Sequence, residues 1–300
     1  MGRVQGLLTL LCSYFVTRSS LSIMQHSCTT RVVDIGVNLT NKAFRKHWRE
    51  VVKRSIDGSA DTLILTGTSM KSSHESMQMA QTWFEEAGTK NLYFTVGVHP
   101  HDAKSFDSDT LETMKELLQH PLAVAVGECG LDFNRNFSPQ PVQIDAFREQ
   151  AKLACLLQKP MFVHEREAHD ALVQVLDEVQ ADDSIPSLPP IVVHCFTGTE
   201  TEALEYIRRG YYIGFTGTIC KKEQGAPLRD ILPKLPLERL MVETDAPFMG
   251  FKKGRRGSEP VDVVDVARRL SETIGTPFDV VCETTTASAR KFFRLRPLPE

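Results

Sequence analysis

The amino-acid sequence predicts an α/β fold, a single-domain (β/α)8 barrel of the TIM type, from three observations. Eight short apolar runs, rich in β-branched residues, are typical of buried strands. Segments of helical length and pattern alternate with them, which favours a parallel sheet with right-handed crossovers. Eight such units fit into about 270 residues, the usual size of this barrel. An open doubly wound sheet is the alternative, but IGVNLT after the first strand is not the Gly-rich phosphate loop expected there.

Each of the first four predicted strands leads into a polar turn and then a helix. VVDIGV (32–37) ends at Asn38, before a helix at 42–55. TLIL (62–65) ends in TGTS, whose hydroxyls can cap a helix at 69–86. YFTVGV (93–98) runs into HPHD, before a helix at 111–119. AVAVG (123–127) leads into ECGLDFNRN, before a long amphipathic helix at 143–158.

The second half of the chain repeats this alternation. MFV (161–163) ends at His164 and precedes a helix at 168–180, after which ADDSIPSLPP is a loop by composition. IVV (191–193) ends at His194, before a helix at 200–209. YYIGF (211–215) ends in TGT, and a shorter helix precedes LMV (240–242). Two helices, at 261–273 and 279–290, complete the predicted fold.

Composition fits a globular enzyme and argues against several other classes. The 300 residues are 41% hydrophobic and 24% charged, which is sufficient for a large core. Because the net charge is −3, nucleic acid would have to bind a local basic patch. No apolar run reaches the ~18 residues of a membrane span. Seven Cys without a CxxC pair predict reduced thiols in an intracellular compartment, cytoplasmic or nuclear, rather than a disulfide framework.

Residues 1–31 are expected to form an extension outside the barrel domain, which we place at 32–300. The first 33 residues contain no Asp or Glu, carry Arg3, Arg18 and Arg31, and are rich in Ser and Thr after an apolar stretch. This composition is typical of a mitochondrial presequence. The Cys usage weighs against a secretory signal at 6–16, and an extension without a targeting role stays open. Met24 is an internal start that would omit most of the segment.

Four predicted strands lead into residues of the types that bind metals: Glu128, His164, His194 and Asp245. Because the carboxyl ends of parallel strands meet at one end of a barrel, we expect these side chains to converge. Two imidazoles and two carboxylates form a ligand set that suits a catalytic divalent cation. A single strand-end His is more often a structural residue, so the hypothesis depends on all four lying together.

Other polar residues near the same strand ends are candidates for contact with substrate. His99 could donate a hydrogen bond to a phosphate oxygen or transfer a proton, whereas His101 is expected to be an exposed loop imidazole. Asp132 is a candidate partner for a metal-binding His. Arg135 and Arg166 are candidates for a phosphodiester or carboxylate clamp, with surface salt bridges as the alternative.

A basic cluster interrupted by Gly follows the last strand. The segment MGFKKGRRGSEP carries four cations, Lys252, Lys253, Arg255 and Arg256. In a barrel this loop lies at the same end as the candidate metal site, where its charge would attract the phosphates of nucleic acid. A solvated charged face is the alternative interpretation.

Together these motifs resemble the TatD family of metal-dependent deoxyribonucleases. GECGLDFNRN, HCFTGT and ETDAP are the most specific, and VDIGVNLT, TGTS, VGVHPHD, MFVHEREAH, YIGFTGTIC and SEP extend the resemblance from Val33 to beyond Pro260. The resemblance implies a TIM barrel of the amidohydrolase-like type that cleaves DNA with Mg²⁺ or another divalent ion. By position it implies four metal ligands, one additional active-site histidine and one acidic residue of a late Glu-Pro motif: Glu128, His164, His194 and Asp245, then His99, then Glu259.

Two positions depart from the usual pattern of that family. Many members begin strand one with His-x-His, whereas Gly36 and Asn38 stand here, which leaves the number of metal ions open at one or two. Glu165 stands where Cys commonly follows the strand-five His, and its charge beside His164 could alter metal affinity or repel a phosphate.

We therefore predict divalent-metal-dependent hydrolysis of phosphodiester bonds in DNA, acting on single strands or ends, with exonuclease action in the 3′–5′ direction favoured by the resemblance. Mg²⁺ is the expected ion, with Mn²⁺ or Zn²⁺ as alternatives. Glu128, His99 and Asp245 are the expected catalytic residues, and Arg166 and the basic loop the expected substrate contacts. A small-molecule hydrolase and a non-catalytic nucleic-acid-binding barrel are the alternatives. No membrane partner is expected, and the sequence does not determine the oligomeric state.

Overall fold

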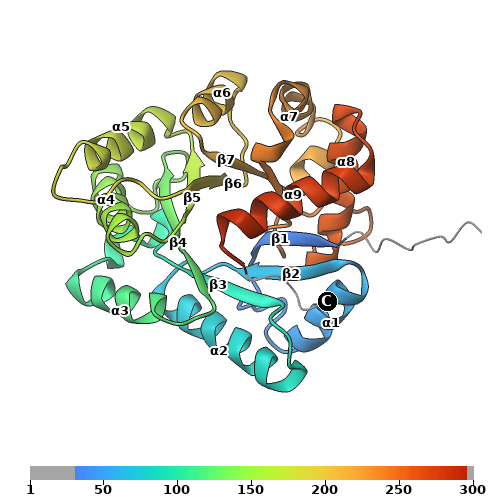
Figure 1. Cartoon of the computed structure of the whole chain (residues 1–300), viewed down its shortest axis with the longest axis horizontal. Coiled ribbons are helices and arrows are strands. Elements are labelled where there is room, and N and C mark those ends of the chain that lie inside the picture. The colour runs from blue at the N-terminus through green and yellow to red at the C-terminus, as the bar shows by residue number, and fades with distance from the viewer. Residues whose placement is uncertain (1–30, 296–300) are drawn as a thin grey trace, which may run out of the picture.

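The computed structural model describes residues 31–295, in which eight strands form one sheet in sequence order. All neighbouring strands are parallel, and most of the helices lie around the outside of the sheet, whereas the last one crosses one end of the barrel (Figure 1). The predicted (β/α)8 barrel is therefore confirmed. The extension expected at 1–31 falls, apart from Arg31, outside the described residues.

The strands are β1 Val32–Val37, β2 Ala60–Leu65, β3 Leu92–Val96, β4 Ala123–Asp132, β5 Met161–Arg166, β6 Ile191–His194, β7 Tyr212–Phe215 and β8 Leu240–Val242. The helices are α1 Trp48–Asp57, α2 Met70–Ala87, α3 Ser108–Leu118, α4 Gln140–Leu157, α5 His169–Gln180, α6 Glu200–Arg208, α7 Ala226–Ile231, α8 Val263–Ile274 and α9 Phe278–Phe292. Short 3-10 turns join them, of which η1 Pro100–Ser105 and η5 Pro260–Asp262 bear on the site.

Strand β4 is longer than the sequence predicts, and this changes the setting of Glu128. The strand was expected to end at Gly127, but it pairs with β5 as far as Asp132 opposite Arg166. All ten of its residues are buried. The absence of a side chain at Gly130 allows β4 and β5 to stay close enough to pair, because a Cβ there would lie 1.9 Å from the backbone oxygen of His164. Glu128 therefore projects from within a strand rather than from a loop.

The first helix, α1, starts later than predicted, at Trp48 instead of residue 42. The intervening residues form turns in which the backbone oxygen of Asn41 accepts from the amides of Phe44 and Arg45. The Asn41 side chain also accepts from the Ala43 amide, and such local bonds compete with a helix.

The barrel closes between β8 and β1 through a short seam. The Asp245 amide donates to the Gly36 oxygen at 2.9 Å, and the Asn38 amide donates to the Ala246 oxygen at 2.8 Å. Beneath these bonds, the buried Asp34 carboxyl accepts from the amide and the hydroxyl of Thr244, at 2.9 and 2.6 Å. Burial raises the pKa of Asp34 well above its usual value, although these hydrogen bonds act in the opposite direction.

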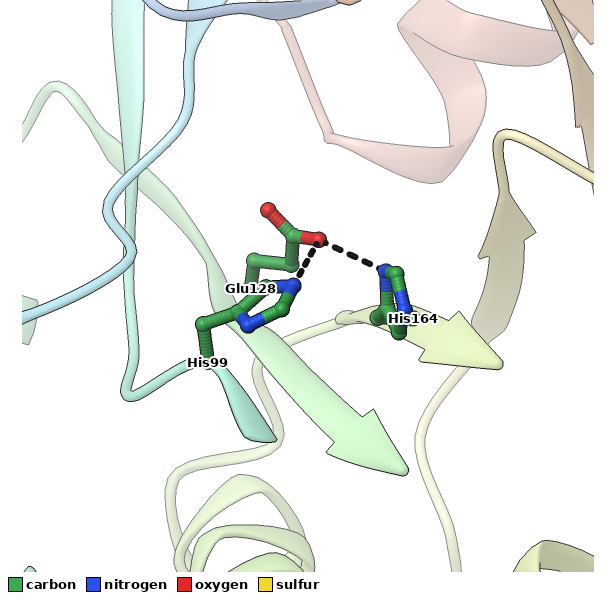
Figure 2. Close-up of side chains that lie close together, drawn as sticks. All are labelled: His99, Glu128 and His164. Carbon is green, nitrogen blue, oxygen red and sulfur yellow. Dashed lines mark hydrogen bonds and ion pairs between the residues drawn. The ribbon is translucent and has the colours of Figure 1, made fainter. Parts of the chain in front are cut away.

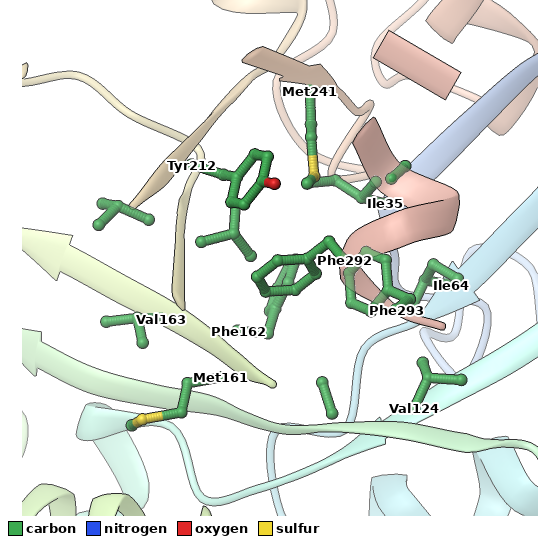
Figure 3. Packing of buried hydrophobic residues seen from close by; sticks show 14 of the residues in the cluster. Ile35, Ile64, Val124, Met161, Phe162, Val163, Tyr212, Met241, Phe292 and Phe293 are labelled. Carbon is green, nitrogen blue, oxygen red and sulfur yellow. The ribbon is translucent and has the colours of Figure 1, made fainter. Parts of the chain in front are cut away.

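The interior of the barrel is filled by apolar side chains such as Ile35, Phe162 and Met241 (Figure 3). Helix α9 packs on the amino ends of the strands, where the Thr286 hydroxyl donates to the Arg31 oxygen at 3.0 Å, just before β1. In the same region the rings of Phe292 and Tyr212 lie edge to face, with centroids 5.4 Å apart. The end of the barrel opposite the candidate ligands is therefore covered. Among residues 31–295, no helix combines the length and apolar character needed to cross a membrane.

Candidate metal centre and active site

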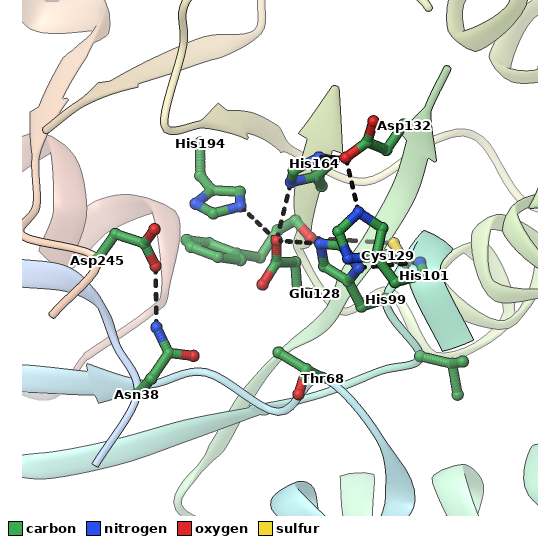
Figure 4. A network of polar contacts seen from close by, with 12 residues as sticks. Asn38, Thr68, His99, His101, Glu128, Cys129, Asp132, His164, His194 and Asp245 are labelled. Carbon is green, nitrogen blue, oxygen red and sulfur yellow. Dashed lines mark hydrogen bonds and ion pairs between the residues drawn. The ribbon is translucent and has the colours of Figure 1, made fainter. Parts of the chain in front are cut away.

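The four predicted metal ligands come from four elements and share one end of the barrel. Glu128 projects from β4, His164 from β5, and His194 is the last residue of β6, whereas Asp245 follows β8. His164 pairs in register with His194, which brings their ring centroids to 5.9 Å. Figure 4 shows Glu128 between these two imidazoles, with Asp245 on the side of β1.

Three imidazoles converge on a single oxygen of Glu128. Its Oε1 lies 2.8 Å from His194 Nε2, 3.0 Å from His164 Nδ1 and 3.2 Å from His99 Nε2. His99, Glu128 and His164 each offer a ligand atom within 4.8 Å of the others (Figure 2). Burial opposes ionisation of Glu128, but the imidazoles outweigh it and hold its pKa well below the usual value.

His194 has a carboxylate at each ring nitrogen, an arrangement that fits a shared cation. Its Nδ1 faces Glu243 Oε2 at 3.3 Å, and its Nε2 faces Glu128 Oε1. Carboxylates only accept hydrogen bonds, and a neutral imidazole has a single N–H. A neutral His194 that donates to Glu243 therefore turns the Nε2 lone pair toward Glu128. Burial lowers the pKa of His194, but the two carboxylates raise it overall, well above its usual value. That lone pair and the negative oxygen of Glu128 repel each other, and a proton or a metal ion between them would remove the repulsion. This donor set therefore fits a divalent ion.

Asp245 approaches the cluster from the opposite side and is held by Asn38. Asn38 Nδ2 donates to Asp245 Oδ1 at 2.9 Å. Burial raises the pKa of Asp245 to about 7, with the charge of Glu128 adding to the effect and His194 opposing it. Asp245 has no ligand atom within the tight group formed by His99, Glu128 and His164. Asn38, at one of the two positions where the usual family pattern has His, thus orients a candidate ligand.

Asp132 and His101 extend the network outward from His164. Asp132 Oδ2 lies 2.7 Å from His101 Nε2, and it forms a longer ion-pair contact of 3.5 Å with His164 Nε2. His101 is half-buried rather than exposed as expected, because this contact draws its ring inward. The His101 amide also donates to His99 Nδ1 at 3.0 Å. Phe137, which is 60% exposed, lies edge-on to the His101 ring with centroids 4.7 Å apart.

Glu165 faces away from the cluster, which removes the basis for a direct effect of its charge on the candidate site. Side chains alternate along a strand, so His164 and Glu165 point to opposite sides of β5. The Glu165 carboxylate accepts from the Ala168 amide at 2.8 Å and from the Tyr206 hydroxyl at 3.2 Å. Arg166 is half-buried beside a pocket, and its guanidinium has no hydrogen bond or ion pair with another residue of 31–295.

The basic loop after β8 divides into paired and unpaired cations. Lys252 Nζ lies 2.8 Å from the buried carboxylate of Asp262, with which Arg255 also forms an ion pair. Lys253 and Arg256 are exposed and form no ion pair within the described part of the chain. Two of the four loop cations that were predicted to contact substrate, Lys252 and Arg255, therefore hold the loop on η5.

Two further acidic residues, Glu259 and Glu243, form buried or partly buried contacts near this end of the barrel. Glu259, which the family resemblance implied, forms an ion pair with Arg54 at 2.6 Å and a capping interaction at η5. Glu243, which the sequence reasoning did not single out, is fully buried and contacts His194. The available signal was the same as for Asp245, since Glu243 directly follows the apolar strand LMV.

A (β/α)8 barrel with imidazoles and carboxylates converging at the carboxyl ends of its strands is typical of metal-dependent hydrolases. Comparisons with known proteins narrow this class. The family model described as TatD related DNase matches residues 33–294. The chain therefore belongs to the TatD family of deoxyribonucleases and is a hydrolase acting on ester bonds.

Individual relatives agree with this assignment over most of their length. The 3′-5′ ssDNA/RNA exonuclease TatD of Citrobacter rodentium is 40% identical over 265 residues, which cover 87% of this chain and 97% of that protein. The protein of the same name from Escherichia coli is 37% identical over 265 residues, covering 87% and 98%. The solved structure of YjjV, a TatD homolog from Escherichia coli, is 27% identical with a TM-score of 0.79 and covers 89% of this chain and 100% of that one.

Proposed function

We propose that this chain is a divalent-metal-dependent exonuclease that hydrolyses single-stranded DNA from the 3′ end. The observation that carries the proposal is the convergence of three imidazoles on one oxygen of Glu128. Membership of the TatD family supports the hydrolysis of phosphodiester bonds. The name shared by the curated relatives, 3′-5′ ssDNA/RNA exonuclease, supports the direction and the preference for single strands, and it adds RNA as a substrate to test.

The proposed metal ligands are Glu128, His164, His194 and Asp245. Such an ion would polarise a phosphoryl oxygen and lower the pKa of a water molecule enough to produce a nucleophile at neutral pH. The mixed set of carboxylates and imidazoles allows Mg²⁺, Mn²⁺ or Zn²⁺. Mg²⁺ is the proposed ion, and a single ion is proposed because Gly36 brings no side chain from β1.

Three further groups would position the substrate and move protons. Asp245 Oδ1 accepts from Asn38, which leaves Oδ2 to accept the proton of the attacking water. Because His99 Nδ1 accepts from the His101 amide, a neutral His99 carries its proton on Nε2 and can donate it to a phosphate oxygen. The unpaired guanidinium of Arg166 is suited to a second phosphate oxygen.

Exposed aromatic and basic side chains at the rim favour a substrate with unpaired bases. Phe137 follows β4 and is 60% exposed, and Phe248 follows β8 and is 51% exposed. Bases of a single strand stack on such rings, worth about 1–3 kcal/mol per base, whereas paired bases in a duplex are not available. Lys253 and Arg256 would contact the phosphate backbone of the same strand.

The direct test incubates metal-depleted protein with single-stranded DNA labelled at its 3′ or its 5′ end, with Mg²⁺, Mn²⁺ and Zn²⁺ titrated separately. The proposal predicts metal-dependent release of the 3′ label as mononucleotides, and a progressively shortened ladder from the 5′-labelled strand. The variant Glu128→Ala should lose this activity and keep a folded barrel by circular dichroism. Near-normal cleavage by Glu128→Ala would contradict the mechanism.

The same experiment separates the alternatives. Hydrolysis of phosphate monoesters, lactones or amides without cleavage of single-stranded DNA would identify a small-molecule hydrolase instead. Tight DNA binding with no cleavage at any of the three metals would identify a binding protein.

A further inference from the structure

Glu243 is a buried carboxylate that the proposed chemistry does not use, and its two oxygens are fully engaged. Oε1 accepts from the Cys195 amide at 2.5 Å, and Oε2 faces His194 Nδ1 at 3.3 Å. The residue has no exposed surface. The Phe162 ring stacks on the face of the His194 imidazole with centroids 4.3 Å apart, while Glu243 contacts one edge of the same ring. Together the two contacts fix the orientation of the imidazole.

The backbone around Glu243 is shaped to admit this carboxylate. A Cβ on Gly36 in β1 would lie 2.4 Å from Glu243 Oε2, and a Cβ on Gly214 in β7 would lie 2.5 Å from Oε1. Real Cβ atoms do not approach oxygen this closely, so any side chain at either glycine would displace the carboxylate. Gly36 stands where many family members carry a strand-one imidazole, and here the neighbouring space holds Glu243.

We propose that Glu243 is a positioning residue that holds His194 as the Nδ1–H tautomer, and that Gly36 and Gly214 are required for its placement. The inference rests on the proposed function in that His194 binds a divalent ion through Nε2. With Glu243 in place, the proton stays on Nδ1 and the Nε2 lone pair faces the ion. Without it, a neutral His194 would gain a hydrogen bond by moving the proton to Nε2, 2.8 Å from Glu128 Oε1, and would cease to be a ligand.

The isosteric variant Glu243→Gln provides a sharp test because it should reverse the tautomer. The Cys195 amide needs an acceptor, so the Gln oxygen takes the place of Oε1, and the Gln NH2 then donates to His194 Nδ1. The proton of a neutral His194 is forced onto Nε2. Gly36→Ala should displace the same carboxylate without changing any charge. Glu165→Gln is the matched control, since Glu165 is also a buried, hydrogen-bonded carboxylate but faces away from the cluster.

Two measurements on the full-length protein decide the matter. Long-range ¹H–¹⁵N NMR of the metal-free protein with ¹⁵N-labelled histidine should show His194 Nδ1 protonated in the wild type and Nε2 alone protonated in Glu243→Gln. Calorimetric titration with Mn²⁺ should show affinity reduced about 10–100-fold in Glu243→Gln and Gly36→Ala, and unchanged in Glu165→Gln. Assignment of the His194 signal by its absence in His194→Gln completes the comparison.

The outcomes separate this inference from the proposed function. If the wild type neither binds Mn²⁺ nor cleaves DNA, the proposed function fails, whereas the ring-proton pattern still reports the Glu243 contact. If the wild type binds and cleaves, and Glu243→Gln keeps both the wild-type pattern and the wild-type affinity, the positioning role of Glu243 is overturned.

Discussion

Replacing Asp34 with Ala tests whether the seam between β1 and β8 holds the barrel closed around the site. Asp34 is fully buried and accepts two short hydrogen bonds from Thr244, at 2.9 and 2.6 Å, and a longer one from the Gly36 amide at 3.3 Å. Each buried donor left without a partner costs about 1–3 kcal/mol. Because two of the donors belong to one residue, we expect a combined loss of about 3–5 kcal/mol. In a domain of this size that lowers Tm by roughly 6–20 °C.

Asp34→Asn is the matched control, since its amide can both accept from the Thr244 amide and donate to the Thr244 hydroxyl. Burial raises the pKa of Asp34, so the folded protein binds the proton more tightly than the unfolded chain. Stability from such a group is complete below the unfolded pKa of about 4 and is lost as pH rises through the folded pKa. The wild type should therefore lose stability relative to Asp34→Asn as pH rises above about 4.

Urea unfolding of the wild type, Asp34→Ala and Asp34→Asn between pH 4 and pH 8 measures both effects. A loss below 1 kcal/mol in Asp34→Ala would refute the proposed role of the seam. A difference between wild type and Asp34→Asn that does not change with pH would refute the assigned cause of the pKa shift.

Three further predictions concern the binding of DNA and of a metal ion to the candidate site. Phe137→Ala should raise KM for single-stranded DNA by about 5–150-fold, the equivalent of one lost stacking contact, with little change in kcat; an unchanged KM would remove the stacking role. Replacing Lys253 and Arg256 together with Gln should reduce the salt dependence of DNA binding by about 0.7 per phosphate contact, whereas Lys252→Gln should mainly lower Tm because Lys252 pairs with the buried Asp262; equal effects on both quantities would contradict this division. Mn²⁺ added to metal-depleted protein at 100 times its Kd should stabilise the fold by about 2.7 kcal/mol in thermal denaturation, and no shift would argue against a metal site.

The sequence predicted which side chains lie close together wherever a polar residue interrupts an apolar strand. Glu128, His164, His194 and His99 meet because their strands are neighbours and parallel, so their positions along the chain were sufficient to place them at one end. Glu243 carries the same signal and was missed, because its neighbour Asp245 explained the motif without it. Whether an acidic residue at a strand end faces the barrel axis or the surrounding helices depends on its place in the alternation of side chains along the strand, as the outward-facing Glu165 demonstrates.

The basic loop shows a different limit of sequence reasoning. Four cations in five residues predict a positive patch, but two of them are neutralised by Asp262, which lies in the following 3-10 turn. The sequence contains both partners, and only the path of the chain after β8 brings them together. The charge available to a substrate is therefore smaller than the composition of the loop indicates.

The primary structure by itself determined the alternation of strands and helices, and hence the barrel, because burial of β-branched runs and parallel pairing leave few other arrangements. It also determined which residue types gather at the open end. Only the tertiary structure decided which atoms meet: that three imidazoles share Glu128 Oε1, that Asn38 holds Asp245, and that Glu243 lies between two glycines beneath His194. The physical reason is that hydrogen-bond geometry varies over tenths of an ångström, whereas the periodicity of a sequence fixes only the side of a strand on which a residue lies.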